Sequence, residues 1–111
     1  MKADPLFLEV LVALGAGNLT IGPIHCDGEP VAGYAVTSGK RKGSVRVDMS
    51  FDCVDTTLHE LCHRMRPKWS ERRVLMQTRR WMRALSDTER DRLFTLIQSV
   101  AKVSKRPMKV V

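Results

Sequence analysis

With 111 residues, 43% of them hydrophobic and 28% charged, the chain has the composition of one ordinary globular domain, which argues against a disordered protein. No apolar run reaches the about 20 residues that cross a bilayer, so we expect no membrane partner. The net charge of +7 is uneven, because residues 1–63 carry 5 basic and 8 acidic side chains whereas residues 64–111 carry 14 basic and 4 acidic ones. The basic half favours a polyanionic partner such as nucleic acid, with a solvated basic face as the alternative.

The first predicted element is a helix that ends at Gly15. Asp4 and Pro5 are a typical N-cap and first helical residue. Apolar residues then recur at helical spacing, at Leu6, Phe7, Val10, Leu11 and Leu14. Asp4, Pro5 and Glu9 interrupt the pattern of a secretory signal, and three cysteines form no even disulfide framework, so we expect a cytoplasmic protein.

Three short β-branched runs follow and predict a three-stranded sheet: residues 19–24, 31–37 and 44–49. The last two flank residues 38–43, which begin with Ser-Gly and end with Gly and predict a hairpin. Val45, Val47 and Met49 alternate with polar residues, so the third strand has one buried face.

From about Asp52 the sequence predicts three helices. The first ends near Arg66, because Pro67 disfavours a helical conformation in the residue before it. The second runs from the N-cap Ser70 to about Leu85, with Trp69 and Val74 spaced for a hydrophobic staple. The third opens on the capping-box pattern of residues 86–89 and runs to about Val103. We therefore expect a single α+β domain over residues 1–111, with a frayed basic tail at 104–111.

The segment His59-Glu60-Leu61-Cys62-His63 is an HExxH motif on a predicted helix. Side chains four apart differ by about 40° around a helix and about 6 Å along it, so both imidazoles can reach one metal ion. Glu60 is displaced by about 60° from His63, which suits a base beside the metal better than a ligand. Zinc lowers the pKa of the water it binds towards about 7, and a carboxylate can then take that water's proton. A pair of half-buried histidines beside a solvated glutamate is the alternative.

A third ligand is sought among the carboxylates that follow His63, since no histidine does. Glu71 shares a predicted helical face with Val74, Leu75 and Thr78, so we expect it to point inward, where a zinc ion would be its partner. The remaining acids, Asp87, Glu89 and Asp91, cluster at a helix start that capping already explains. The alternative for Glu71 is a simple charge at a helix N-terminus.

Leu58 to His63, followed by Pro67 and by Ser70-Glu71, resembles the small HExxH metallopeptidases of phages and prophages. It also resembles the minimal gluzincins, in which a glutamate of the next helix completes a two-histidine zinc site, and the Leu-Cys filling resembles that of Spartan-type proteases. The resemblance covers about residues 45–85. It implies a zinc metallopeptidase. In the α+β domain predicted here, we expect the zinc between the sheet edge and the motif helix.

The resemblance also implies a substrate strand before the motif helix. Zincins bind extended peptide along that strand by β-augmentation, which here means Ser44, Val45, Arg46, Val47, Asp48 and Met49. Tyr34 or His25 is a candidate for stabilising the oxyanion, against packing and loop roles for these residues. Cys53 and Cys62 are expected in the core, whereas Cys26 is a candidate cap for an open zinc site.

Peptide-bond hydrolysis is the preferred function, with zinc on His59, His63 and Glu71 and with Glu60 as base then acid. One rival is a nucleic-acid-binding module, in which the predicted second helix presents Arg72, Arg73, Arg79, Arg80 and Arg83. These arginines are equally compatible with a solvated face, and no aromatic residues interleave them in the sequence. The other rival is a latent or inactive zincin that acts through protein interaction, because 111 residues leave little material for a cleft.

Overall fold

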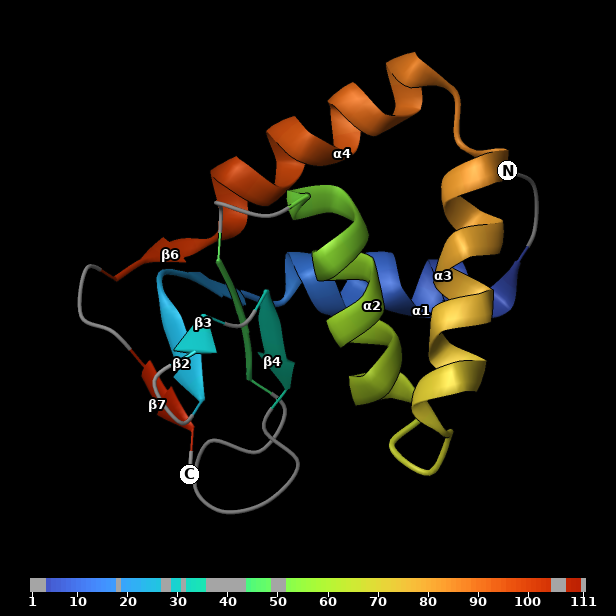
Figure 1. The fold of residues 1–111 in the computed structure, drawn as a ribbon. Helices are drawn as coiled ribbons and strands as arrows, with labels where there is room; N and C mark the ends of the chain where they lie inside the picture. Colours follow the sequence, from blue (N-terminus) through green and yellow to red (C-terminus); the bar gives the residue numbers. More distant parts are fainter. Residues whose placement is uncertain are drawn as a thin grey trace.

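The computed structural model describes residues 4–17, 19–26, 29–30, 32–35, 44–48, 52–104 and 108–110, with only the backbone described at 25–26, 29–30 and 108–110. Four helices and seven short strands make up these segments (Figure 1). The predicted α+β class is confirmed. No helix among the described residues has both the length and the apolar character needed to cross a membrane.

Each helix begins where a side chain caps it. The helices are α1 (Pro5–Gly15), α2 (Cys53–Met65), α3 (Glu71–Ala84) and α4 (Asp87–Val100), and their N-caps are Asp4, Asp52, Ser70 and Ser86. The cap of α4 is the predicted capping box, since Ser86 and Glu89 bond to each other's backbone N–H groups. The predicted helix starts are therefore confirmed, and each start is set by a local hydrogen bond that the sequence encodes.

The sheet is larger than the three predicted strands. The order in the main sheet is β4 (Gly33–Ala35), β5 (Val45–Val47), β1 (Leu19–Ile21) and β6 (Lys102–Val103). A second set pairs β3 (Glu29–Pro30), β2 (Ile24–Cys26) and β7 (Met108–Val110). The predicted run 19–24 is split between β1 and β2, because Gly22 and Pro23 interrupt it.

The C-terminal residues differ from the frayed tail that the sequence predicts. β6 pairs in parallel with β1, and Ser104 donates its backbone N–H to the Ile21 carbonyl at 2.8 Å. β7 pairs in parallel with β2. The helix α4 ends at Val100, short of the expected Val103, because the next residues join the sheet. Parallel pairing with strands some 80 residues away is a tertiary contact that local sequence does not signal.

The neighbours of β5 correct the expected substrate strand. β5 pairs with β4 on one side and with β1 on the other, so its backbone hydrogen-bonding groups face strands of the same sheet. A peptide adds to a strand whose edge is free. Within the described segments the edge strands of this sheet are β4 and β6, and it is β4 that lines the pocket of Glu60.

The helix α2 lies between the sheet and α3, with α1 behind it and α4 across one end (Figure 1). Its inner face is buried at Val54, Leu58, Leu61 and Cys62, while His59, Glu60 and His63 are only partly buried. Trp81 of α3 is 1% exposed; it packs edge-on against Phe7 and donates its indole N–H to Asp4 at 2.6 Å. The hydrophobic core thus fixes α2 against its neighbours and leaves the motif side chains at its margin.

Candidate metal centre

The two motif histidines lie side by side on α2, one turn apart. Their ring centroids are 4.9 Å apart, and their side chains are 15% and 22% exposed for His59 and His63, respectively. The neighbours Leu58, Leu61 and Cys62 are buried in the core, so the helical period turns both imidazoles to the edge of the α2–α3 contact. The rings are therefore held by packing and remain open to solvent.

Glu71, the first residue of α3, reaches both rings. Its Oε1 lies 2.7 Å from His59 Nε2, and its Oε2 lies 2.7 Å from His63 Nε2. The turn at residues 66–70 and the Ser70 cap place the start of α3 opposite the end of α2. Contrary to the expected inward orientation, the side chain is 69% exposed, because it lies along the rim of the helix pair rather than in the core.

The three side chains form a compact donor set. One nitrogen from each histidine and one oxygen from Glu71 all lie within 4.8 Å of one another. Partial burial acts to raise the pKa of Glu71, but the adjacent His59 and His63 outweigh it, so this pKa lies below its ordinary value. An ionised carboxylate with two imidazoles matches the ligand chemistry of a catalytic zinc site, which uses three protein ligands and leaves a position for water. The residues therefore fit a metal ion, and they lie between α2 and α3 rather than between the sheet edge and α2.

Glu60 lies beside this donor set in a small pocket of about 280 Å³. The pocket is lined by Glu60, His63 and Glu71 together with Pro67 and the three residues of β4. Burial, and secondarily the negative charge of Glu71, raises the pKa of Glu60 from 4.5 to about 7. In the metal-free protein its carboxyl group is thus poised to bind or release a proton near neutral pH.

Gly33 brings β4 directly against Glu60. A Cβ at position 33 would lie 2.6 Å from Glu60 Cγ and 2.7 Å from Thr56 Cγ2, distances that real Cβ contacts do not reach. Only glycine therefore allows this separation between β4 and α2. The sequence prediction missed Gly33, because nothing in the local pattern indicates which helix its strand will approach.

The other predicted site residues fall in three groups. Tyr34 is half-buried in β4 and lines the Glu60 pocket, whereas the side chains of His25 and Cys26, and the whole of Met49, lie outside the described part. Cys53 and Cys62 are free, buried thiols, and burial raises the pKa of each, to about 11 for Cys62. The five arginines of α3 line a separate, larger pocket along that helix.

Asp55 is a further residue that the sequence prediction missed. It is half-buried on α2, one turn before His59. Burial, followed by the charge of Asp52, raises its pKa, while His59 and Arg79 act in the opposite direction. Asp55 therefore lies within electrostatic reach of both the donor set and the arginines of α3.

Comparisons with protein-family models, with curated proteins and with solved structures find no match for this chain. The assignment of a function therefore depends on the residues and their geometry.

Proposed function

We propose that this protein is a zinc-dependent metallopeptidase that hydrolyses peptide bonds with activated water. The observation that carries the proposal is the convergence of His59, His63 and Glu71 within 4.8 Å, with the Glu60 pocket beside them. The histidines belong to one helix and the glutamate to the next, so the group depends on the pairing of α2 with α3. A solvated surface histidine pair would not require a carboxylate that bonds to both rings.

In this proposal His59, His63 and Glu71 hold the ion, and Glu60 handles the proton. When bound, zinc would act as a Lewis acid that acidifies water and polarises the scissile carbonyl. Glu60 accepts the water's proton and later delivers it to the leaving amine, as a carboxylate within reach of both groups can do. Tyr34 lines the same pocket and could donate a hydrogen bond to the developing oxyanion.

The substrate is proposed to be an extended peptide that pairs with the outer edge of β4. Gly33, Tyr34 and Ala35 line the Glu60 pocket, so a peptide on this edge would pass the base. Pairing through the backbone recognises an extended conformation rather than a particular side chain. We therefore expect cleavage of unfolded or flexible segments in preference to compact domains.

The test combines metal analysis with a cleavage assay. Protein that is stripped with a chelator and reloaded with zinc should contain one zinc per chain and should cleave an unstructured protein such as casein. Clearly less than one zinc per chain after reloading contradicts the metal site. One zinc without cleavage of any unfolded substrate supports instead a zincin that acts through protein interaction.

A further inference from the structure

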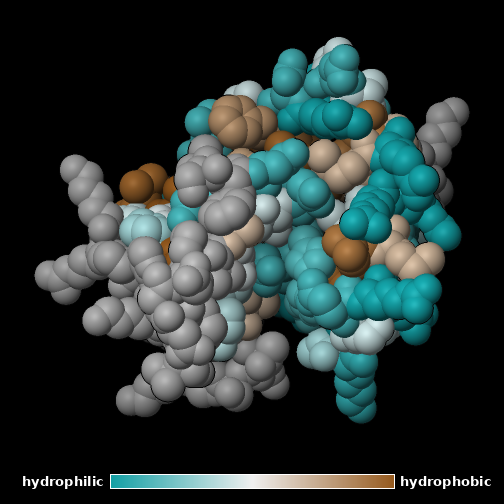
Figure 2. Space-filling view, viewed as in Figure 1, coloured by the Kyte–Doolittle hydropathy of each residue, from teal (hydrophilic) through white to brown (hydrophobic). Residues whose placement is uncertain are grey.

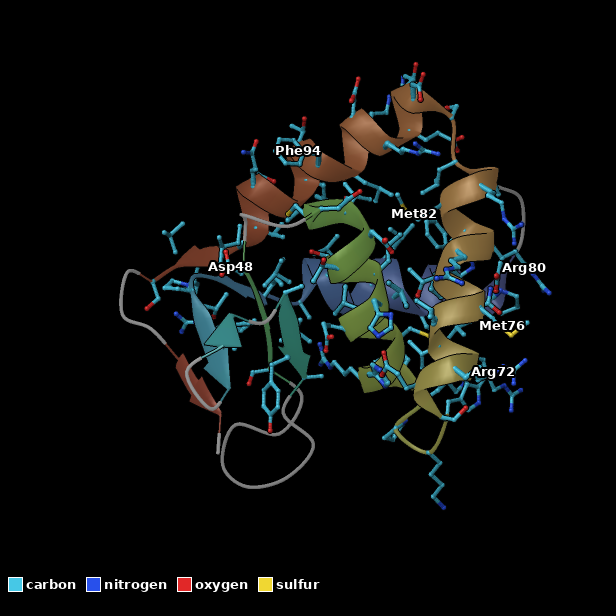
Figure 3. The ribbon with its side chains drawn as sticks, in the orientation of Figure 1. Asp48, Arg72, Met76, Arg80, Met82 and Phe94 are labelled. Carbon is cyan, nitrogen blue, oxygen red and sulfur yellow. The ribbon has the colours of Figure 1, made fainter. Side chains whose placement is uncertain are left out.

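The helix α3 carries a second candidate site on its outer side. A pocket of about 870 Å³ runs beside this helix, and its lining includes Arg72, Arg73, Arg79, Arg80 and Arg83. In the view of Figure 3, Arg72, Met76 and Arg80 project from α3 on the side away from α2. We call these five arginines, with Trp69 and Met76, the arginine groove. Figure 2 shows this side of the molecule covered by hydrophilic side chains, with hydrophobic ones visible between them.

The positive charges of the groove outnumber the negative charges in its lining, five to one. None of the five guanidinium groups forms a hydrogen bond or an ion pair with another described residue, although Arg79 is close enough to Asp55 to lower its pKa. By contrast, the guanidinium of Arg66 bonds to Glu9 and that of Arg90 bonds to the Met82 carbonyl. The lining contains one carboxylate, Asp55. Close positive charges repel one another, so an anionic partner would stabilise this arrangement.

The groove also offers surfaces on which bases can stack. The guanidinium carbon of Arg73 lies 4.0 Å from the centroid of the Trp69 ring, and Met76 is 59% exposed. Proteins that bind single strands stack bases on aromatic side chains, and Trp69 is the aromatic residue of this lining. The linear sequence hides this feature, because Trp69 precedes α3 and only the turn brings it alongside the helix.

The spacing of the arginines fits a phosphate backbone. Arg72 and Arg83 are separated by about 16 Å along the helix axis, a length that covers several consecutive phosphates of one nucleic-acid strand. Guanidinium groups bind phosphate through paired N–H donors. In a duplex the base faces are stacked inside and cannot reach Trp69, so a single strand fits the groove better.

We propose that the arginine groove binds single-stranded nucleic acid, with phosphates on its arginines and bases against Trp69 and Met76. The groove uses none of the residues of the metal centre. Binding is therefore expected in metal-free protein and in the Glu71→Ala variant alike, and the proposal stands or falls independently of the peptidase activity.

The first test measures the binding of a fluorescent thymidine oligonucleotide of about 15 nucleotides by anisotropy, over a range of salt concentrations. Five phosphate contacts predict a slope of about −3.5 for log affinity against log salt, at about −0.7 per contact. The double variant Arg80→Ala/Arg83→Ala should bind on the order of tenfold more weakly, with a slope near −2. The matched control is Arg92→Ala/Lys102→Ala, which removes two exposed charges that do not line the groove. An equal loss of oligonucleotide affinity in the two double variants would contradict the proposed site, because the oligonucleotide would then respond only to the net charge of the protein.

The second test uses tryptophan fluorescence and needs no variant. Trp81 is buried, whereas Trp69 lines the groove, so stacking of bases should quench part of the emission. Polyglutamate supplies the negative charge without the bases and should neither quench nor compete effectively. Competition by polyglutamate as strong as that by the oligonucleotide would point to an acidic protein partner and overturn the proposal. A higher affinity for a duplex of the same length would overturn its single-strand part.

Discussion

The two sides of α3 differ in how their polar groups are matched. On the side facing α2, Glu71 bonds to both motif histidines, and each of its oxygens has a partner at 2.7 Å. On the outer side, five arginines line a pocket whose lining includes one carboxylate, that of Asp55 from α2. The two histidines and Glu71 bond to one another and are close enough to bind one small ion together. The arginines carry an excess of positive charge spread along the helix, which an extended anionic partner would neutralise. One helix therefore supplies a ligand to one candidate site and the binding residues of another, and variants can separate the two.

The largest expected effect on the metal side comes from Glu60→Gln. The amide keeps the shape of the side chain but cannot accept a proton, so peptide cleavage should fall by about 10²- to 10⁴-fold. Zinc content and oligonucleotide binding should be unchanged. The control is Asp91→Asn, an equivalent change at an exposed position of α4. Cleavage at the parental rate by the Glu60→Gln variant would exclude Glu60 as the base.

Gly33→Ala tests whether the rate of peptide cleavage depends on the position of the Glu60 carboxylate as well as on its ability to accept a proton. The added methyl group must displace Glu60 or Thr56, and a misplacement of about 1 Å can reduce the rate by about 10²-fold. Zinc should still bind, because the atoms nearest to the new methyl group belong to Glu60 and Thr56 rather than to a proposed ligand. Gly15→Ala is the control, since no atom lies within 4 Å of its added Cβ. Full cleavage activity in Gly33→Ala would show that β4 can move away from α2 without cost.

Glu71→Ala removes the one proposed ligand that the motif does not contain. Loss of a ligand should weaken zinc binding by at least the 10- to 100-fold known for outer partners of metal ligands, and the zinc-dependent gain in melting temperature should shrink. Asp87→Ala is matched in position, because Asp87 is likewise the first residue of its helix. It should lower stability by about 0.3 to 1 kcal/mol, the usual effect of a first-turn charge, and leave zinc affinity unchanged. If Asp87→Ala weakened zinc binding and Glu71→Ala did not, the proposed set of zinc ligands would be wrong.

The smallest effect is a pH dependence of stability in the metal-free protein. The folded state holds a proton on Glu60 up to about pH 7, whereas the unfolded chain releases it near 4.5. The unfolding free energy should therefore fall as pH rises from 4.5 to 7, by on the order of 1 to 2 kcal/mol since the pocket still admits water. Chemical denaturation with chelator present measures this slope, which should become much smaller in Glu60→Gln and somewhat smaller in Glu71→Ala. If the unfolding free energy of Glu60→Gln depended on pH as strongly as that of the parent protein, a group other than Glu60 would be responsible.

The success of the sequence predictions depended on the range of the interactions involved. All four helix starts were predictable, because each N-cap bonds to a backbone group two or three residues away. Glu71 could be selected as a ligand candidate, because few acids follow His63, although its exposed orientation was predicted wrongly. The sequence did not show that β5 is paired on both sides, because this depends on β1, which occupies its second edge.

The sequence by itself determined the spacing of His59, Glu60 and His63 and the composition of α3, because helical periodicity converts spacing directly into a shared face. Tertiary structure alone decided that Glu71 bridges the two rings, that Gly33 lets β4 contact Glu60, and that Trp69 lies beside the arginines. Each of these contacts joins separate elements, and their approach is set by the packing of the whole core around α2. The local sequence therefore shows which chemical groups each element carries. Which of these groups come into contact with one another is decided only when the chain folds.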